Sequence, residues 1–166
     1  MFHPQSKDLL MMYHCEINKV LGTTLVDTGA TRNYISARYA KKANLRFSRG
    51  DANSLRNIRL PNGQNMTILG QCEFELKMSQ WTGTVVATIL DLEADFDVVF
   101  GLSWHRQWKP LADWDTLDMF INTPEGAQRI VHKYGYVKRL MNAPILTSLE
   151  DWPVDFKCQC DLASGR

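Results

Sequence analysis

The sequence predicts a mainly β fold with one or two short helices. Apolar and polar side chains alternate from Gln71 to Met78, which is the pattern of a strand with one face in water. The dipeptide Asn62-Gly63 lies between two β-type runs and is a strong signal for a hairpin turn. The β-branched residues of Thr84 to Leu90 favour a partner strand.

The length of the chain suits one domain with extensions. It has 166 residues, of which 45% are hydrophobic, and one globular domain accounts for most of this length. We expect an N-terminal tail over residues 1–7 and the folded domain over residues 8–134. A C-terminal linker or tail is expected over residues 135–166, where hydrophobic periodicity fades and prolines recur.

The charge of the chain is balanced. Lysine and arginine number 19 against 18 acidic residues, which gives a formal net charge of +1. This balance provides no electrostatic reason to expect direct binding to nucleic acid or to a membrane surface. The apolar run from Leu9 to Tyr13 is too short for the core of a signal peptide, and no stretch approaches the roughly 20 apolar residues that span a bilayer. We therefore expect a soluble, cytoplasmic protein.

The four cysteines give only a weak indication of a metal site. Cys158 and Cys160 are close in sequence, but structural zinc usually requires two such ligand pairs. Free thiols in a reducing compartment are expected, rather than a metal site or a disulfide. We expect no metal and no cofactor.

The first part of the domain predicts two strands and a helix. Leu9 to Ile17 and Val20 to Val26 are β-type runs, and Asn18-Lys19 between them predicts a hairpin turn. Ser36 to Ala43 places apolar residues on one face at helical spacing. Asn44, directly after this segment, suits the left-handed position that ends many helices.

The middle of the domain predicts a hairpin and a strand pair. Residues 57–69 form the hairpin, with the Asn-Gly turn at its centre. Gly83 predicts the turn that leads from the alternating strand into Thr84 to Leu90.

The last part of the domain predicts a helix and a further hairpin. Val98 to Phe100 is an apolar strand, and Leu102 to Trp108 predicts a short helix that Ser103 could cap. The two strands of the hairpin are predicted at residues 117–121 and 129–132.

The stretch LVDTGATRNYIS contains a possible catalytic carboxylate. Asp27 ends an apolar strand and is followed by a hydroxyl, at Thr28, and by Gly29, which has no side chain. Asp and Gly are also common in surface turns, so the tripeptide alone favours neither a site nor a turn. It occurs once in the chain.

Three pieces of sequence in a fixed order carry a family resemblance. They are TLVDTGATRNYIS, RLPNGQNMTILG and FDVVFGLSW, and the resemblance covers the chain from about Leu9 to Lys133. Their order resembles the retropepsin-like aspartic proteases, most closely those of long-terminal-repeat retrotransposons of the Ty3/gypsy type. The first and third pieces are specific, and the second is much less so.

The resemblance implies a fold and a catalytic arrangement. The fold would be the closed β-barrel of the acid proteases, with one lobe per chain and activity as a twofold dimer. Asp27 would be the catalytic residue and would face its own copy across the twofold axis. Two carboxylates about 3 Å apart cannot both ionise, so they share a proton and can act as acid and base together.

The resemblance also implies roles for other residues. Thr28 and Gly29 would support the active-site loop, together with Val99, Phe100 and Gly101. The groove for the substrate would be lined by Ala30, Arg32 and Asn33, and by the flap tip at Pro61, Asn62 and Gly63. The chain departs from the family at Ser103, where an acidic residue is common, and at this flap tip, which is not a run of glycines.

The function implied is that of an aspartic endopeptidase. It would form a homodimer, cleave polypeptides and process a retrotransposon Gag-Pol polyprotein, which would place it in the cytoplasm or in virus-like particles. Two segments, Leu9 to Tyr13 and the strand around Ile130-Val131, could add to the dimer interface or could pack within one chain.

Three alternatives stay open beside this interpretation. One is a host protease of the DNA-damage-inducible or skin retroviral-like kind. Another is a domesticated relic that dimerises or binds peptides without cleaving them. The last is an unrelated β-sandwich with a chance Asp-Thr-Gly. The intact tripeptide favours an active enzyme, because a binding module has no need of the carboxylate.

Overall fold

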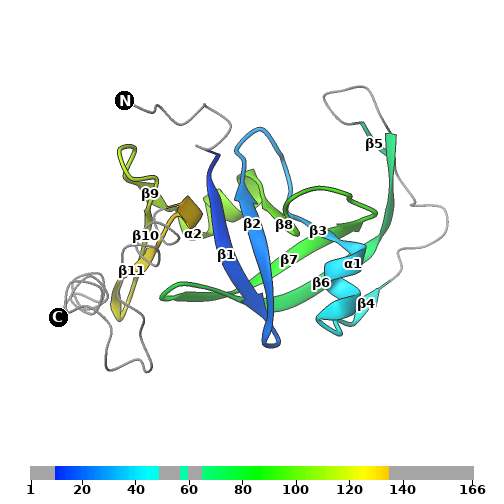
Figure 1. The fold of residues 1–166 in the computed structure, drawn as a ribbon, viewed down its shortest axis with the longest axis horizontal. Helices are drawn as coiled ribbons and strands as arrows, with labels where there is room; N and C mark the ends of the chain where they lie inside the picture. The colour runs from blue at the N-terminus through cyan, green and yellow to red at the C-terminus, as the bar shows by residue number, and fades with distance from the viewer. Residues whose placement is uncertain (1–9, 49–56, 60–64, 135–166) are drawn as a thin grey trace.

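The computed structural model describes residues 10–48, 57–59 and 65–134 (Figure 1). The helices are α1 (Ala37–Lys42) and α2 (Leu102–Trp108). The strands are β1 (Met12–Ile17), β2 (Val20–Val26), β3 (Tyr34–Ser36), β4 (Phe47–Ser48), β5 (Asn57–Arg59), β6 (Asn65–Met78), β7 (Trp81–Leu90), β8 (Val98–Phe100), β9 (Leu111–Ala112), β10 (Met119–Thr123) and β11 (Gly126–Ile130).

Six strands form a closed barrel in the order β1-β2-β8-β3-β7-β6. The barrel closes where Glu16 of β1 pairs with Lys77 of β6. The short strands β4 and β5 add to the edge of β6, while β9, β10 and β11 form a separate sheet beside the barrel (Figure 1). The prediction of a mainly β, closed barrel with two short helices is confirmed. Within the described segments, no helix is long and apolar enough to cross a membrane.

The first hairpin has the predicted turn. Asn18 and Lys19 have φ angles of 49° and 65°, as a two-residue turn of type I′ requires. Ile17 therefore pairs with Val20, and the ladder continues to Met12 opposite Leu25. The strand begins at Met12 rather than at Leu9.

The helix α1 also has the predicted ends. The hydroxyl of Ser36 accepts a hydrogen bond from the backbone N–H of Tyr39 (3.1 Å), which caps the N-terminus. Asn44 has a φ angle of 55° and its N–H donates to the carbonyl of Lys41, so it ends the helix in the left-handed conformation. Tyr39 and Ala40 bury one face of the helix against the barrel.

The alternation in β6 is confirmed, but the turn after it is not where glycine predicted it. Four residues of β6 point into the core, namely Cys72, Phe74, Leu76 and Met78. The turn falls at Ser79-Gln80, and Gly83 lies inside β7. A Cβ at Gly83 would lie 2.3 Å from the ring of Trp81 and 2.7 Å from that of Trp108. Gly83 therefore makes room for two tryptophans within a strand.

These tryptophans belong to an aromatic cluster under α2. The ring of Trp81 packs edge-on against Trp104 and Trp108, with centroids 5.8 and 5.0 Å apart. Phe100 stacks on Trp104 at 4.7 Å. Because Phe100 ends β8 and Trp104 lies on α2, the cluster fixes the helix to the barrel next to Gly101.

The last hairpin is confirmed with shifted ends. Met119 pairs with Ile130, and the turn closes between Thr123 and Gly126, where Gly126 has a φ angle of 119°. Leu117 lies outside the strand, because its φ angle is 62°.

Both segments suggested for a dimer interface contact the rest of their own chain. Tyr13 and Ile130 are fully buried. Met11 accepts a hydrogen bond from Val26, and Arg129 accepts one from Gln80. Leu10 keeps 51% of its surface exposed.

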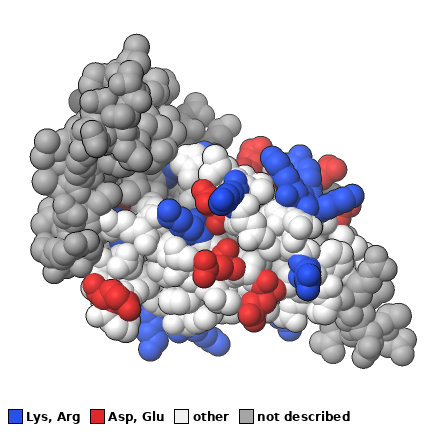
Figure 2. All heavy atoms as spheres, turned by 90° about the horizontal axis from the view of Figure 1, so that it is seen from below, with Lys and Arg blue, Asp and Glu red and all other residues white. Residues whose placement is uncertain are grey.

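Acidic and basic side chains are mixed on the molecular surface seen in Figure 2. Lysine and arginine lie between aspartate and glutamate there, and neither sign covers the face. This face therefore has no broad field of one sign.

Candidate active site

Asp27 lies at the end of β2, where the chain is held by β8. The two strands are parallel, with Val26 beside Phe100. The backbone N–H of Asp27 donates to the carbonyl oxygen of Phe100 at 2.9 Å. Phe100 and Asp27 are 73 positions apart in the sequence, so a distant segment of the chain fixes the start of the loop.

The loop orients the carboxylate of Asp27 through its own backbone. The N–H of Gly29 donates to Oδ1 of Asp27 at 2.8 Å, and the N–H of Ala30 donates to the carbonyl of Asp27 at 3.1 Å. A Cβ at Gly29 would lie 3.0 Å from the same Oδ1, so a side chain would crowd this contact. Asp27, Thr28 and Gly29 are all exposed in the single chain. The carboxylate is therefore held in place and open to a ligand.

Gly101 lies against the second half of the loop. The carbonyls of Ala30 and Thr31 accept hydrogen bonds from Leu102 (2.8 Å) and Ser103 (3.3 Å). A Cβ at Gly101 would lie 2.3 Å from the carbonyl oxygen of Arg32 and 2.6 Å from that of Ala30. Only glycine allows this approach of two backbones.

The rest of the predicted support is buried. Phe100 is fully buried, and Val99 keeps 8% of its surface exposed. Val99 pairs with Leu25 on one side and with Tyr34 on the other, so β8 lies between the strands that enter and leave the loop.

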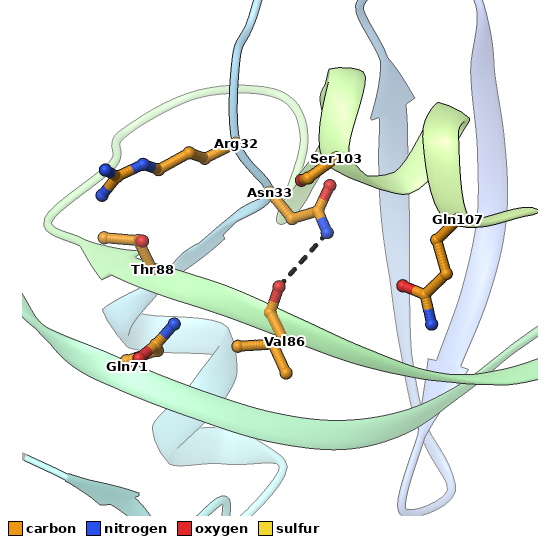
Figure 3. A pocket seen from close by; sticks show the side chains of 7 residues that line it. All are labelled: Arg32, Asn33, Gln71, Val86, Thr88, Ser103 and Gln107. Carbon is orange, nitrogen blue, oxygen red and sulfur yellow. Dashed lines mark hydrogen bonds between the residues drawn. The ribbon is translucent and has the colours of Figure 1, made fainter.

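Asn33 connects the loop to β7. Its Oδ1 accepts the N–H of Gly101 (3.1 Å), and its Nδ2 donates to the carbonyl of Val86 (3.2 Å; Figure 3). Its own carbonyl accepts the N–H of Thr88 (2.9 Å). Asn33 is buried, so both the oxygen and the nitrogen of its amide are used to hold Gly101 and Val86 in place.

The helix α2 does not begin as predicted. Gly101, rather than Ser103, is the N-cap residue, and no side chain caps this end. Ser103 is already in the first turn, where its backbone N–H bonds to Thr31. The capping prediction is wrong because the loop carbonyls take the place of a capping side chain.

A pocket of about 250 Å³ lies beside the loop. It brings together Arg32 and Asn33 from the predicted set, and Ala30 is half-buried nearby in the loop. Asp27 does not line it. Five further lining residues were not predicted as site residues: Gln71, Val86, Thr88, Ser103 and Gln107 (Figure 3).

The predicted flap tip, Pro61, Asn62 and Gly63, lies outside the described residues. The strands on either side of it are described and pair in antiparallel fashion, with Ile58 opposite Met66 and Arg59 opposite Asn65. These pairs lie in the two strands that flank residues 60–64 in the sequence.

Comparison with known proteins gives a family and a fold. A family profile described as the PEG10/RTL1 protease domain matches residues 23–129, more than half of the chain. The fold is similar to the crystal structure of the retroviral protease-like domain of Ddi1 from Leishmania major, with a TM-score of 0.58 and 17% identity over 74% of this chain and 93% of that one.

Two further structural similarities have lower TM-scores. The EIAV protease complexed with the inhibitor HBY-793 gives a TM-score of 0.48 and 14% identity, over 64% of this chain and 93% of that one. A retropepsin-like aspartic protease from Rickettsia conorii gives 0.41 and 16%, over 61% and 75%. No curated protein matches the sequence.

Proposed function

Because the chain belongs to the PEG10/RTL1 protease domain family, we propose that it is an aspartic endopeptidase that works as a dimer of two identical chains. The observation that carries this proposal is the carboxylate of Asp27, which is exposed and is oriented by the N–H of Gly29. The hydrogen bond from Gly29 fixes one oxygen of this exposed carboxylate and leaves the other oxygen open to a ligand.

The chemistry requires a second carboxylate. Hydrolysis by water needs a base that takes a proton from the water and an acid that protonates the carbonyl oxygen. Two carboxylates that share one proton meet both needs. The sequence contains a single Asp-Thr-Gly, so the second Asp27 comes from another copy, and a closed twofold dimer is the commonest way to supply it.

In the proposed reaction, the ionised carboxylate accepts a proton from water as the oxygen attacks the peptide carbon. The protonated carboxyl of the other copy donates its proton to the carbonyl oxygen. Collapse of the tetrahedral intermediate then breaks the carbon–nitrogen bond, and the leaving nitrogen takes a proton from the pair. The exposed Thr28 next to Asp27 would help to join the two loops across the axis.

The substrate would be a polypeptide, and we propose a retrotransposon Gag-Pol polyprotein as the natural one. Support for this finer assignment comes from the three sequence pieces that resemble long-terminal-repeat retrotransposon proteases. Ile58 and Met66 would belong to the base of a flap that covers the bound peptide.

A dilution series tests the proposal. Cleavage of a denatured protein mixture would be measured at mildly acidic pH, with and without a statine-type inhibitor, while sedimentation reports the fraction of dimer in the same samples. We expect inhibitor-sensitive cleavage that falls with the square of protein concentration when the dimer is dilute. A fully active monomer would contradict the shared site. A stable dimer that cleaves nothing would favour the alternative, a module that dimerises or binds peptides.

A further inference from the structure

The pocket beside the active-site loop is lined by polar residues and a single positively charged one. Its walls come from the segment before β3, from β6 and β7, and from α2 (Figure 3). Among the seven described lining residues, Arg32 is the charged one, and Val86 is apolar. The others are polar and uncharged, namely Asn33, Gln71, Thr88, Ser103 and Gln107.

The guanidinium of Arg32 is available to a ligand. Arg32 is exposed. Within residues 10–48, 57–59 and 65–134 its guanidinium forms no ion pair, and the ion pair found there joins Arg129 to Asp118. Figure 3 shows Arg32 extending along the rim of the pocket, with its guanidinium on the same side as Thr88 and Gln71. Gln107 extends from α2 at the opposite end of the pocket. A cation and several hydrogen-bond donors therefore border one hollow.

The wall behind Arg32 is fixed. Asn33 is buried and bridges Gly101 to Val86 by hydrogen bonds at 3.1 and 3.2 Å. The carbonyl of Arg32 itself lies against Gly101, where a Cβ would approach it to 2.3 Å. The backbone behind Arg32 is therefore preformed, while the side chains of Arg32, Gln71 and Gln107 are exposed and can adjust to a ligand.

The pocket is within reach of a peptide bound at Asp27. Arg32 follows Asp27 by five residues, which span at most about 17 Å even in a fully extended chain. A bound peptide in extended conformation advances about 3.3 Å per residue. The pocket therefore lies within the length that about five residues of a bound peptide cover.

We propose that this pocket selects an acidic side chain, Asp or Glu, of the polypeptide substrate, and that Arg32 is the residue that determines this preference. The inference rests on the proposed protease function. Arginine offers a planar pair of donors that matches a carboxylate, and the amide and hydroxyl groups of Gln71 and Thr88 supply further donors. No carboxylate among the seven lining residues repels the ligand.

The size of the pocket fits one side chain. Its volume of about 250 Å³ falls below the range of about 300–1,000 Å³ that is usual for whole small-molecule ligands. Because the site is open to water, the charge preference should be modest, at about three- to fivefold, and it should shrink as salt screens the pair.

The test uses random peptide pools about ten residues long, a length that covers about 33 Å in extended form. One position in turn is fixed as Glu, Gln or Lys. Cleavage rates are measured with the wild-type chain, and binding of the same pools is measured with Asp27→Asn, which needs no turnover. We expect the Glu pool to exceed the Lys pool about three- to fivefold at one position, and Arg32→Glu to reverse this order.

Arg38→Glu is the matched control, because Arg38 is an exposed arginine on α1 that does not line the pocket. It should keep the wild-type order. Cleavage without a charge preference, or a preference that survives in Arg32→Glu, would overturn the inference and leave the protease function standing. Charge-selective binding without cleavage would reject the protease function and keep the pocket assignment. The absence of both would reject both.

Discussion

Two aspartates in this fold have opposite surroundings. Asp118 is 2% exposed, and its oxygens accept hydrogen bonds from the guanidinium of Arg129 and from the backbone of His132. Asp27 is exposed, and its carboxylate accepts one hydrogen bond in the described part of the chain, from Gly29. The carboxylate of Asp118 thus has several partners and links Arg129 of β11 to the backbone of His132. The carboxylate of Asp27 is oriented by one hydrogen bond and is otherwise open to solvent.

The two arginines differ in the same way. Arg129 keeps 15% of its side chain exposed and pairs with Asp118, whereas Arg32 is exposed at the rim of a pocket. Asp118 and Arg129 have their partners within the chain, whereas Asp27 and Arg32, for which we propose a ligand, are exposed. The predictions below test this contrast.

The largest effect is expected at Asp27. Asp27→Asn is nearly isosteric but cannot take a proton from water, so cleavage should fall by at least about 10³-fold. The melting temperature should stay the same or rise slightly, because the variant replaces both close carboxylates of the dimer, one in each copy, and so removes their repulsion. Turnover and thermal melting of the two proteins check this. Turnover near the wild-type rate would refute the role of Asp27.

Asp118 should show the reverse pattern. Asp118→Ala removes one partner of a buried ion pair and should lower the free energy of unfolding by about 3 kcal/mol. Urea denaturation measures this loss. Asp115→Asn, at an exposed position in the same loop, should change it by less than about 0.5 kcal/mol. Equal effects of the two variants would show that the Asp118 network contributes little.

Asn33 should affect both properties. Asn33→Ala leaves the N–H of Gly101 and the carbonyl of Val86 without their partner, which costs about 1–3 kcal/mol of stability. The loop that carries Asp27 loses a fixed neighbour, so turnover should fall more than the population of folded protein does. Asn122→Ala, on an exposed position of β10, is the control and should change neither. A loss of stability with full specific activity would limit Asn33 to the fold.

The smallest effect concerns buried acids of the barrel at high pH. Burial raises the pKa of the thiols of Cys15 and Cys72 to about 11, and it also raises the pKa of Tyr13 and Tyr39. The folded state therefore holds these protons longer than the unfolded state does. The stability that the buried thiols contribute is complete below pH 9 and is lost as pH rises towards 11.

The loss from one such thiol should be about 1 kcal/mol at pH 10. Melting temperatures from pH 7 to 11 measure it, and Cys15→Ser should flatten part of the slope. A stability that does not change over this range would mean that these groups titrate alike in both states.

Much of the fold follows from local sequence signals. The turn at Asn18 and the end of α1 at Asn44 need left-handed backbone, which asparagine tolerates. The alternation in β6 follows from the two faces of one strand. Such features depend on neighbouring residues alone, and the sequence predicts them well.

The errors arise where distant segments meet. Gly83 indicates a turn by its residue type, but it lies within β7, where the absence of a side chain leaves room for the ring of Trp108 on α2. Ser103 looks like a helix cap, but the carbonyls of the Asp27 loop satisfy the start of α2 instead. Neither contact can be read from the residues next to these positions.

The residues of the candidate site also fall into two groups, those that a local motif identifies and those that only the fold brings together. Asp27, Gly29 and Gly101 could be named because a motif marks them, and the geometry of the loop gives a physical reason for each glycine. The pocket residues could not be named. Gln71 and Gln107 are ordinary polar residues on a wet strand face and on a helix, and only the folded chain places them around one hollow.

The pairing of Val26 with Phe100 also means that the Asp27 loop cannot form its contacts until long after Asp27 has been synthesised. A chain under synthesis emerges from its N-terminus at about 5–20 residues per second. Asp27 is made early, but the carbonyl of Phe100 that holds it and the N–H of Leu102 that holds Ala30 are made some seventy residues later. In a nascent chain the Asp27 loop therefore lacks these two hydrogen bonds for several seconds, until most of the barrel has been translated.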